Sequence, residues 1–347
     1  MDMDNLKKYV CLVPFQYMEI HHMGIYSCCP TWLPTKIGDL NEISNIWESQ
    51  KLKEVQESIL DGSYSHCSIE YCPSLSQLYH KGISERATFI PKNQFNIENY
   101  KKPRTFNYGF DRSCNLTCPS CRSEKIMANS KEIEDIDWII KEIETNYGED
   151  LQGLYLSGTA DPFASKSFRK LLTDFDKNKY PKVNNIQLHT NGILFNKKMW
   201  DLIEPVQKLL TVLEISIDAA TKETYEEVRT GGDWDILMDN LKFISTLPLK
   251  SIRLSMVVQN NNYMEMSDFY NIMYNMFGNK AHIFFKKISN WGTFSNEEFL
   301  RKEIHNPAHP EFNMFLLQLI KIDKKHNCLH SFHDIIDKHI KKDIKLI

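Results

Sequence analysis

Apolar and polar positions in the middle of the chain follow two alternating patterns. Short runs rich in Ile, Leu and Val, typical of buried strands, are each followed by a segment whose apolar residues recur every three or four positions, as on one helix face. The predicted strands are Thr105–Phe110, Gly153–Leu156, Asn185–His189, Thr211–Ile217, Ser251–Val258 and His282–Lys286. The predicted helices are Lys131–Tyr147, Ser167–Phe175 with Ser165 as its expected cap, Lys197–Ile203, a segment beginning near Thr221, Trp234–Thr246 and Tyr263–Met276.

Regular alternation of strand and helix predicts a parallel sheet, because parallel neighbours need a crossover connection and the crossover is right-handed. The fold class is therefore α/β, and polar residues at the carboxyl ends of the strands are the expected place for chemistry. Beyond Asn290 the pattern becomes helical, with Pro310–Ile322 and Cys328–His339 as the predicted helices.

The N-terminal part reads as a separate, cysteine-rich module from about Cys11 to Leu75. Within it, residues from Glu42 to Leu60 have the apolar spacing of one amphipathic helix. Residues from Lys81 to Pro103 show no periodicity, which predicts a connecting strap. The expected division is a module of residues 1–80, a strap of residues 81–103, a strand–helix domain of residues 104–290 and a helical extension of residues 291–347.

Composition limits which binding partners and which cellular compartment we expect. The formal net charge of −3 is spread over 347 residues, so no basic surface predicts a nucleic-acid partner. There is no run of about 18 apolar residues and the first residues are polar, so we expect neither a membrane span nor a secretory signal. Nine cysteines in such a chain indicate metal ligands rather than disulfides, and a reducing cytoplasm.

Three of the cysteines follow the first strand of the strand–helix domain. Cys114, Cys118 and Cys121 have the spacing C-x3-C-x2-C, with no fourth cysteine close behind. Structural zinc sites use four ligands, whereas three thiolates on one loop would hold three irons of a cubane cluster and leave the fourth iron open for a ligand. A zinc loop that borrows a remote cysteine or histidine is the alternative.

A second group of thiols lies in the N-terminal module. Four thiolates from two separated loops can bind zinc or a fully ligated cluster, and spacing alone does not separate the two. We interpret His21 and His22 as a solvated strand end rather than as ligands. The cysteines of this group are Cys11, Cys28, Cys67 and Cys72, with the adjacent Cys29 as a substitute for Cys28.

The three-cysteine loop resembles that of the radical S-adenosylmethionine (radical SAM) enzymes, whose motif has this spacing after the first strand of a partial (β/α)6 parallel barrel. Ser120 stands where many members have an aromatic residue. The resemblance implies that Cys114, Cys118 and Cys121 hold a [4Fe–4S] cluster. It also implies that this cluster, reduced by a flavodoxin- or ferredoxin-type protein, cleaves S-adenosyl-L-methionine to a 5′-deoxyadenosyl radical.

Other strand ends extend this resemblance. The turn Ser157–Pro162 takes the place of the family's Gly-Gly-Glu-Pro turn, although an ordinary helix-capping turn is the alternative. The strand end at Ser216 and the Arg-x-Gly-Gly string at Arg229 resemble the family's fourth unit, which implies contacts to the ribose and to the methionine carboxylate; a surface ion pair of Arg229 with Glu226 is the alternative. The expected cofactor contacts are Gly158, Thr159, Ala160, Asp161, Asn191, Ser216, Asp218, Arg229 and Gln259.

The N-terminal module resembles the SPASM or twitch extension of these enzymes, which in most relatives follows the barrel. The resemblance rests on the order of the cysteines, on Gly38-Asp39-Leu40 and on the helix with Trp47. It implies that Cys11, Cys28, Cys67 and Cys72 bind one auxiliary [4Fe–4S] cluster.

The expected function is hydrogen abstraction from a peptide or protein for an oxidative modification. A sugar or other small metabolite is the alternative substrate, and a non-catalytic iron–sulfur electron carrier is a different class altogether. Cys328 is interpreted as a lone buried thiol rather than a hydrogen-atom donor, His309 as a helix-entry residue rather than an acid–base group, and Gln259 and Asn260 serve equally as caps of the next helix.

Overall fold

The computed structural model describes residues 3–82, 88–156 and 158–340. It divides into two compact units. The first contains residues 1–112, 128–159 and 174–186, and the second contains residues 113–127, 160–173 and 187–347. Strand β7 (Asn185–Thr190) has residues in both units.

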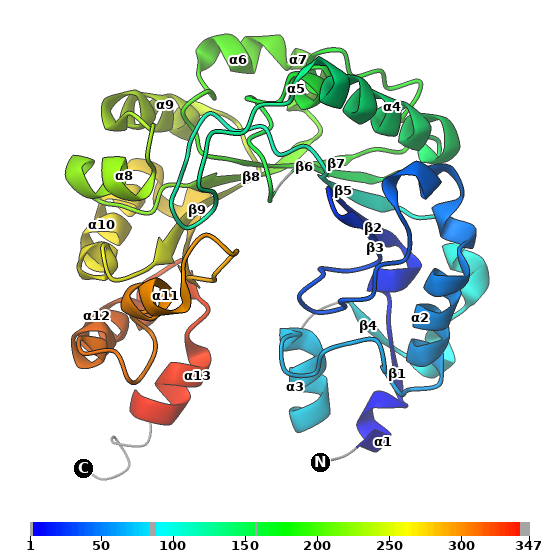
Figure 1. Cartoon of the computed structure of the whole chain (residues 1–347), viewed down its shortest axis with the longest axis horizontal. Helices are drawn as coiled ribbons and strands as arrows, with labels where there is room; N and C mark the ends of the chain where they lie inside the picture. Colours follow the sequence, from blue (N-terminus) through cyan, green and yellow to red (C-terminus); the bar gives the residue numbers. More distant parts are fainter. Residues whose placement is uncertain (1–2, 83–87, 157, 341–347) are drawn as a thin grey trace. The chain divides into compact units, whose positions relative to one another are not determined.

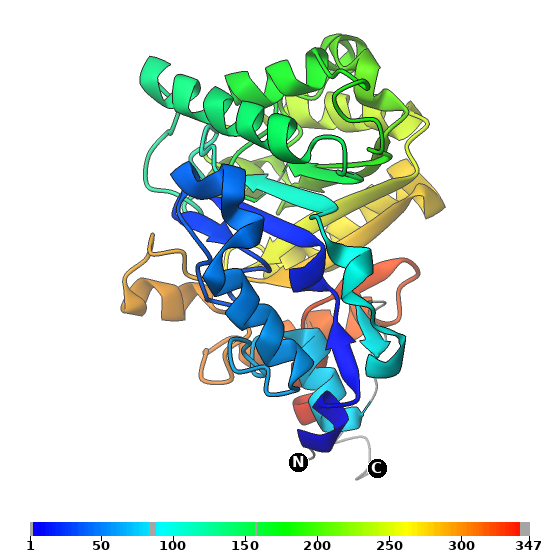
Figure 2. The ribbon, with the colours of Figure 1, turned by 90° about the vertical axis from the view of Figure 1, so that its right-hand side faces the viewer.

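The sheet of the first unit joins the N-terminal module to the first strands of the strand–helix domain. Its order is β3 (Gly24–Tyr26), β2 (Tyr17–His21), β5 (Thr105–Gly109) and β6 (Gly153–Leu156). Only the β2–β3 pair is antiparallel. Figure 2 shows β2 and β5 side by side, in blue and cyan. A strand that precedes the predicted barrel therefore extends its parallel sheet.

Helix α4 (Ser130–Tyr147) covers part of this unit. Its capping box at Asn129 satisfies the first backbone N–H groups, and its apolar face is buried. The Tyr147 hydroxyl at its end donates to the carbonyl of Ile43 at 2.9 Å, in the 3-10 helix η2 (Leu40–Glu48).

The predicted helix Glu42–Leu60 is wrong as a single element. The structure has η2 followed by α2 (Gln50–Leu60), with Ser49 in extended conformation between them. The side chain of Ser49 accepts the N–H of Leu52, so the residue caps α2 and cannot continue η2.

The predicted strap also contains regular structure. Strand β4 (Phe89–Pro91) pairs antiparallel with β1 (Tyr9–Cys11), and two short 3-10 helices follow. Residues 83–87 of the strap lie outside the described residues. A three-residue strand is too short to show a period, so only pairing reveals it. The remaining short elements of this unit are α1 (Met3–Leu6), η1 (Val13–Phe15), α3 (Pro73–Lys81), η3 (Lys92–Gln94) and η4 (Ile97–Tyr100).

The sheet of the second unit is parallel in the order β8 (Leu210–Ser216), β9 (Ser251–Val258), β10 (Ala281–Lys287) and β11 (Cys328–His330). The helix predicted over Cys328–His339 is therefore wrong at its start. Its first residues pair with β10, and this pairing overrides their helical spacing. Only then follow α13 (His333–Ile335) and η7 (Ile336–Ile340).

Helices cover one side of these strands, as Figure 1 shows for α8, α9 and α10. Phe269 of α10 packs edge-on against Phe285 of β10, with ring centroids 5.8 Å apart. The predicted α/β alternation and the helical C-terminal part are confirmed. The helices and 3-10 helices of this unit are α5 (Lys166–Thr173), α6 (Lys197–Leu202), α7 (Glu204–Gln207), α8 (Lys222–Val228), α9 (Trp234–Thr246), η5 (Tyr263–Glu265), α10 (Met266–Phe277), η6 (Gly278–Lys280), α11 (Asn296–Lys302) and α12 (Phe312–Asp323).

The two faces of the second sheet differ in polarity. Alternate residues such as Leu213, Leu254 and Ile283 are buried on the helix-covered face. The residues between them include Glu214 and Arg253, which are partly exposed. Because side chains alternate across a strand, the face away from the helices is polar. Across the described residues, no helix is long and apolar enough to cross a membrane.

Candidate active site

The loop after β5 is folded so that its three cysteines lie on one short stretch of backbone. The N–H of Cys114 donates to the carbonyl of Ile126 at 2.9 Å, which closes the loop. The N–H groups of Cys121 and Arg122 both donate to the carbonyl of Cys118, which forms a tight turn. Cys114 and Cys118 are buried, while Cys121 is exposed. The loop thus presents three free thiols from one frame of hydrogen bonds.

Each thiol of this loop lies within hydrogen-bonding distance of a side-chain N–H donor. Arg229 Nη1 lies 3.7 Å from Cys118 Sγ, and Asn191 Nδ2 lies 3.7 Å from Cys114 Sγ. Arg122 Nη2 lies 3.6 Å from Cys121 Sγ. Donors of this kind stabilise sulfur in its negatively charged form and adjust the potential of clusters bound through it. Three thiols, each beside a side-chain donor, are suited to bind an iron–sulfur cluster as thiolates.

Burial disfavours these thiolates in the absence of a cation. It raises the pKa of Cys114 to about 11. Burial also raises the pKa of Cys118, and the guanidinium of Arg229 opposes this shift. Because metal ligands must be deprotonated, cluster assembly here releases protons. Among the described residues, no three Cys, His, Asp or Glu side chains gather closely enough to hold a single metal ion; in a cubane, each thiolate binds a different iron.

Arg229 is held by Asp218 rather than by Glu226. Its Nη2 lies 2.7 Å from Asp218 Oδ2, and both side chains are almost fully buried. Burial lowers the pKa of Arg229, but Asp218 and Cys118 raise it more, so its net pKa lies above the usual value. The Nε of Arg229 is buried and has no partner among the described groups. A buried donor without an acceptor is costly, and a carboxylate would satisfy it.

Asp218 itself has an unusual backbone. Its φ of 68° lies in the left-handed region, where aspartate is tolerated better than most residues. Its Oδ1 accepts the N–H of Val257 at 2.7 Å, which joins the end of β8 to β9. Strained backbone held this firmly is common at functional sites. The conformation aims the second oxygen, Oδ2, at Arg229.

Ser216 ends strand β8 beside a histidine. Its Oγ lies 2.7 Å from His189 Nε2 and 3.3 Å from Ser255 Oγ. Burial lowers the pKa of His189 to about 4, so the imidazole is neutral near pH 7. His189 begins a polar string that the sequence places at the mouth of the barrel, but neither His189 nor Ser255 is among the expected cofactor contacts. The sequence feature that could have identified both is a polar residue at a strand position that faces away from the helices.

The turn after β6 separates into two parts. In the first unit, Gly158 has a φ of 98° and open space where a Cβ would lie, so backbone there is accessible to a ligand. Thr159 Oγ1 donates to the carbonyls of Gly109 and Asp111 at 2.6 and 3.1 Å, which fastens the ends of β6 and β5 together.

In the second unit, Ala160 is half-buried and Asp161 is fully enclosed. Asp161 Oδ2 accepts Thr190 Oγ1 at 2.7 Å and the N–H of Asn191 at 2.8 Å. Its Oδ1 accepts the N–H of Phe163 at 3.0 Å. Burial raises the pKa of this carboxyl, and these bonds oppose the shift. Protein groups therefore occupy both oxygens, so Asp161 ties the turn to the end of β7.

Asn191 after β7 and Gln259 after β9 are also held by neighbouring residues. Asn191 Nδ2 also donates to Asn115 Oδ1 at 2.9 Å, which fixes Asn191 beside the cysteine loop. Gln259 is buried, and its N–H is accepted by Asn262 Oδ1 at 2.8 Å. Asn262 also donates to the carbonyl of Asp218 at 2.8 Å, so this residue, which the sequence did not single out, joins the ends of β8 and β9.

The N-terminal thiols form an electrostatic group within the first unit. Burial raises the pKa values of Cys11 and Cys67 to about 12, and Cys72 adds to both shifts. Burial raises the pKa of Cys28 well above its usual value, with further contributions from Cys11, Cys72 and Cys67. Charges that interact in this way lie near one another. The four thiols assigned from the sequence are therefore neighbours.

Cys29 has different surroundings. Burial raises the pKa of its thiol, and Glu19 is the next largest cause. The backbone of Thr31 and Trp32 opposes the shift. Of the two adjacent cysteines, Cys28 is the one grouped with the other three thiols.

The remaining residues noted in the sequence are distributed as follows. His22 is exposed, whereas His21 is half-buried and burial lowers its pKa to about 4, so only His22 is a solvated strand end. Cys328 is half-buried in β11, and burial raises the pKa of this thiol to about 12.

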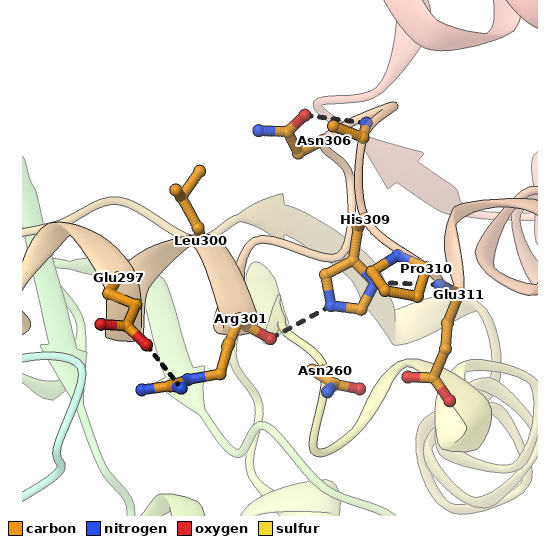
Figure 3. A pocket seen from close by; sticks show the side chains of 9 residues that line it. Asn260, Glu297, Leu300, Arg301, Asn306, His309, Pro310 and Glu311 are labelled. Atoms are coloured by element: carbon orange, nitrogen blue, oxygen red, sulfur yellow. Dashed lines mark hydrogen bonds and ion pairs between the residues drawn. The ribbon is translucent and has the colours of Figure 1, made fainter.

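Residues around α11 form a hollow of about 580 Å³ (Figure 3), lined partly by Asn260, Arg301 and Glu311. His309 accepts the N–H of Glu311 at Nδ1, so its Nε2 carries the proton and donates to the carbonyl of Arg301 at 3.1 Å. Both ring nitrogens are engaged, so His309 joins α11 to the start of α12, as a helix-entry residue does.

Comparison with known proteins now defines the class. Residues 110–273 match the model of the radical SAM superfamily, and residues 11–73 match the SPASM model, an iron–sulfur cluster-binding domain. The protein belongs to the radical SAM superfamily and is an enzyme of that class. In this member of the superfamily the SPASM domain precedes the barrel. The cofactors are S-adenosyl-L-methionine, a [4Fe–4S] cluster and auxiliary iron–sulfur clusters.

Solved structures give further similarities, and no curated protein sequence matches significantly. Streptococcus suis SuiB bound to the precursor peptide SuiA is 12% identical, with 97% of this chain and 74% of that chain covered and a TM-score of 0.45. Native anSMEcpe with bound AdoMet is 13% identical, with coverages of 69% and 67% and a TM-score of 0.41. A radical SAM methyltransferase from Sphaerobacter thermophilus is 12% identical, with coverages of 60% and 61% and a TM-score of 0.37.

Proposed function

We propose that this enzyme removes a hydrogen atom from a peptide or protein substrate in an oxidative modification. The observation that carries the proposal is the cysteine loop, where Cys114, Cys118 and Cys121 each lie within hydrogen-bonding distance of a side-chain N–H donor. When bound, the cluster and S-adenosylmethionine supply an electron and the 5′-deoxyadenosyl radical. The protein orients these groups and keeps the radical from solvent.

The residues around the loop have distinct roles in this proposal. The buried Nε of Arg229 binds the carboxylate of the cofactor, since none of the described residues accepts its hydrogen. Ser216, held by His189, faces the ribose hydroxyls, and Asn191 orients Cys114. Gly158, Thr159 and Ala160 offer backbone groups rather than side chains. Asp161 and Asp218 act as positioning residues, since their carboxylate oxygens accept hydrogen bonds from protein groups. Gln259, buried at the end of β9, is kept as a cofactor contact.

The N-terminal thiols have a separate role. We assign Cys11, Cys28, Cys67 and Cys72 to one auxiliary [4Fe–4S] cluster, because these thiols lie close enough to raise one another's pKa. Four thiolates leave no iron open, so such a cluster accepts an electron or holds the site in shape. In this proposal the module spans residues 1–80, the strap residues 81–103, the barrel residues 104–290 and the extension residues 291–347.

A peptide is the first choice of substrate because SPASM modules accompany peptide modification in related enzymes. A sugar or other small metabolite is the second choice. A flavodoxin- or ferredoxin-type protein supplies the electron, and the reducing cytoplasm is the proposed setting. A non-catalytic electron carrier would differ from both, since it would leave S-adenosylmethionine intact.

Metal content and cofactor cleavage test the proposal together. Anaerobically reconstituted protein should hold about eight irons, as two cubanes require, and the variant with Cys114, Cys118 and Cys121 changed to alanine about four. Reduced wild-type protein should form 5′-deoxyadenosine slowly without substrate, and the triple variant none. Zinc in place of iron, or equal product from both proteins, would end the assignment.

A further inference from the structure

The polar face of the second sheet carries a cluster of charges that the proposed cofactor contacts do not use. Barrel interiors are commonly filled by layers of branched apolar side chains. Here the face away from the helices presents Glu214 on β8, Arg253 on β9 and Lys286 on β10. Glu214 pairs with Arg253 across the two strands in register. A polar, partly exposed inner face is suited to binding a polar ligand.

Glu214 lies at the centre of this cluster. Its Oε1 accepts Lys286 Nζ and lies 3.7 Å from His189 Nε2, and its Oε2 lies 4.0 Å from Arg253 Nη1. Burial raises the pKa of Glu214, but His189, Lys286 and Arg253 lower it more, so the group is ionised. Because His189 is neutral, one negative charge faces two positive charges.

The two cations of the cluster have N–H donors that are exposed to solvent and available to a ligand. The side chains of Arg253 and Lys286 are each 39% exposed, whereas that of Glu214 is 15% exposed. Within the described part of the chain, the guanidinium of Arg253 makes no hydrogen bond, and it lies over the ring of Phe284 at 6.0 Å. A planar guanidinium with free N–H groups binds a carboxylate through two parallel hydrogen bonds.

The place of this cluster relative to Ser216 is set by the strand. Glu214 precedes Ser216 by two residues and points to the same face, which puts it about 7 Å closer to the amino end of β8. Ser216 pairs with Ser255, so the next strand repeats this order. Glu214 and Arg253 therefore lie deeper along the same face than the residue assigned to the ribose. Lys286 pairs with Val257, nearer the carboxyl ends of the strands, and its side chain reaches back to Glu214.

We propose that Arg253 and Lys286 bind a carboxylate of the substrate in competition with Glu214, whose negative charge offsets one of the two cations. The inference rests on the proposed function, and it narrows the substrate to a peptide with an acidic side chain or a free carboxyl terminus near the reacting carbon. A cationic group would be repelled, because the cluster is already net positive.

Three blocked tripeptides test this on the reconstituted holoenzyme with S-adenosylmethionine. They are acetyl-Gly-Glu-Gly-amide, its Gln counterpart, and acetyl-Gly-Gln-Gly with a free carboxyl terminus; binding is measured by calorimetry or saturation-transfer NMR. The Glu peptide or the free-acid peptide should bind about tenfold more tightly than the Gln amide. Whichever of the two does so identifies the source of the carboxylate. Equal binding of all three would overturn the proposal.

Two variants should move the affinity in opposite directions. Lys286→Gln removes a donor and should weaken binding of the acidic peptide about tenfold. Glu214→Gln frees both cations and should strengthen it about threefold. A purely structural cluster would give weaker binding in both variants, which would contradict the proposal. Lys242→Gln, at an exposed ion pair on α9, is the matched control and should change nothing.

The failure of this inference is distinguishable from failure of the proposed function. Formation of 5′-deoxyadenosine by the wild-type protein is measured without any peptide. Product without preference for the acidic peptides would remove only the carboxylate site. Preference for the acidic peptides without product would keep the site and remove the radical reaction.

Discussion

At the scale of single residues, Arg229 takes part in both cluster binding and cofactor binding in the proposed function. Its guanidinium contacts Asp218 and the thiol of Cys118, and its Nε has no acceptor among the residues that the structure describes. The sequence predicted a cofactor contact for Arg229 from its Arg-x-Gly-Gly string, with a surface ion pair to Glu226 as the alternative. In the structure Arg229 pairs with Asp218 instead. Asp218 could not have been chosen instead, because its left-handed backbone is visible only in the folded chain.

Arg229→Lys should therefore be far from conservative. Lysine keeps the charge but cannot reach Asp218, Cys118 and a cofactor carboxylate at once. We expect affinity for S-adenosylmethionine to fall about tenfold or more, which corresponds to one lost charge-assisted interaction. The measurement is equilibrium binding to reconstituted protein. Arg301→Lys, in the exposed pair with Glu297, is the control, and similar losses in both variants would refute the role of Arg229.

His189 makes stability depend on pH. Its pKa is lowered from 6.5 to about 4 by burial, so between these values the unfolded chain binds a proton that the folded protein does not. The free energy of unfolding should thus fall as pH is lowered, by about 2 kcal/mol between about pH 7 and about pH 5 for this residue.

His189→Gln should reduce that fall, since glutamine can still donate to Ser216 but does not titrate. Denaturant unfolding of both proteins at the two pH values measures the difference. His21 and His305 have pKa values of about 4 as well and contribute equally to both proteins. Identical pH dependence in the two proteins would show that His189 is not the cause.

At the scale of elements, prediction succeeded where local pattern and tertiary contacts agree. The strand at Ser251–Val258 and the helix at Trp234–Thr246 have the bounds that periodicity gave them. It failed where a single contact decides the outcome. Ser49 divides one amphipathic segment into two helices, and Cys328–His330 becomes a strand only because β10 offers it hydrogen bonds. No local signal records either event.

Substitution of the N-terminal thiols tests whether the N-terminal module is needed for substrate turnover. Cys67→Ala with Cys72→Ala removes two of the four thiolates and should abolish turnover of a substrate, if the auxiliary cluster carries its electron. The double variant retains all three cysteines of the barrel loop. Iron content, 5′-deoxyadenosine and modified substrate are measured side by side in folded protein. Full turnover in that variant would eliminate the electron-transfer role.

At the scale of the whole molecule, the sequence predicted the class because the spacing of the three-cysteine motif is local. The alternation of strands and helices likewise indicated the fold, while the assignment of the two cysteine groups as cluster ligands stays a prediction. The network of Glu214, Arg253 and Lys286 lies outside such reasoning, because its members are far apart in the chain and meet only through strand register. The choice of Cys28 over Cys29 likewise depends on side-chain surroundings.

The pairing of β2 with β5 has a consequence for synthesis on the ribosome. Tyr17 faces Thr105, so about 90 residues must be translated before the two strands can meet. Until then β2 has only its antiparallel neighbour β3, and most of its backbone groups await a partner. A nascent chain stalled before that point would carry the auxiliary thiols on an unfinished sheet edge. Iron insertion at the N-terminal cysteines is therefore expected after translation of the first barrel strand, rather than as that module emerges.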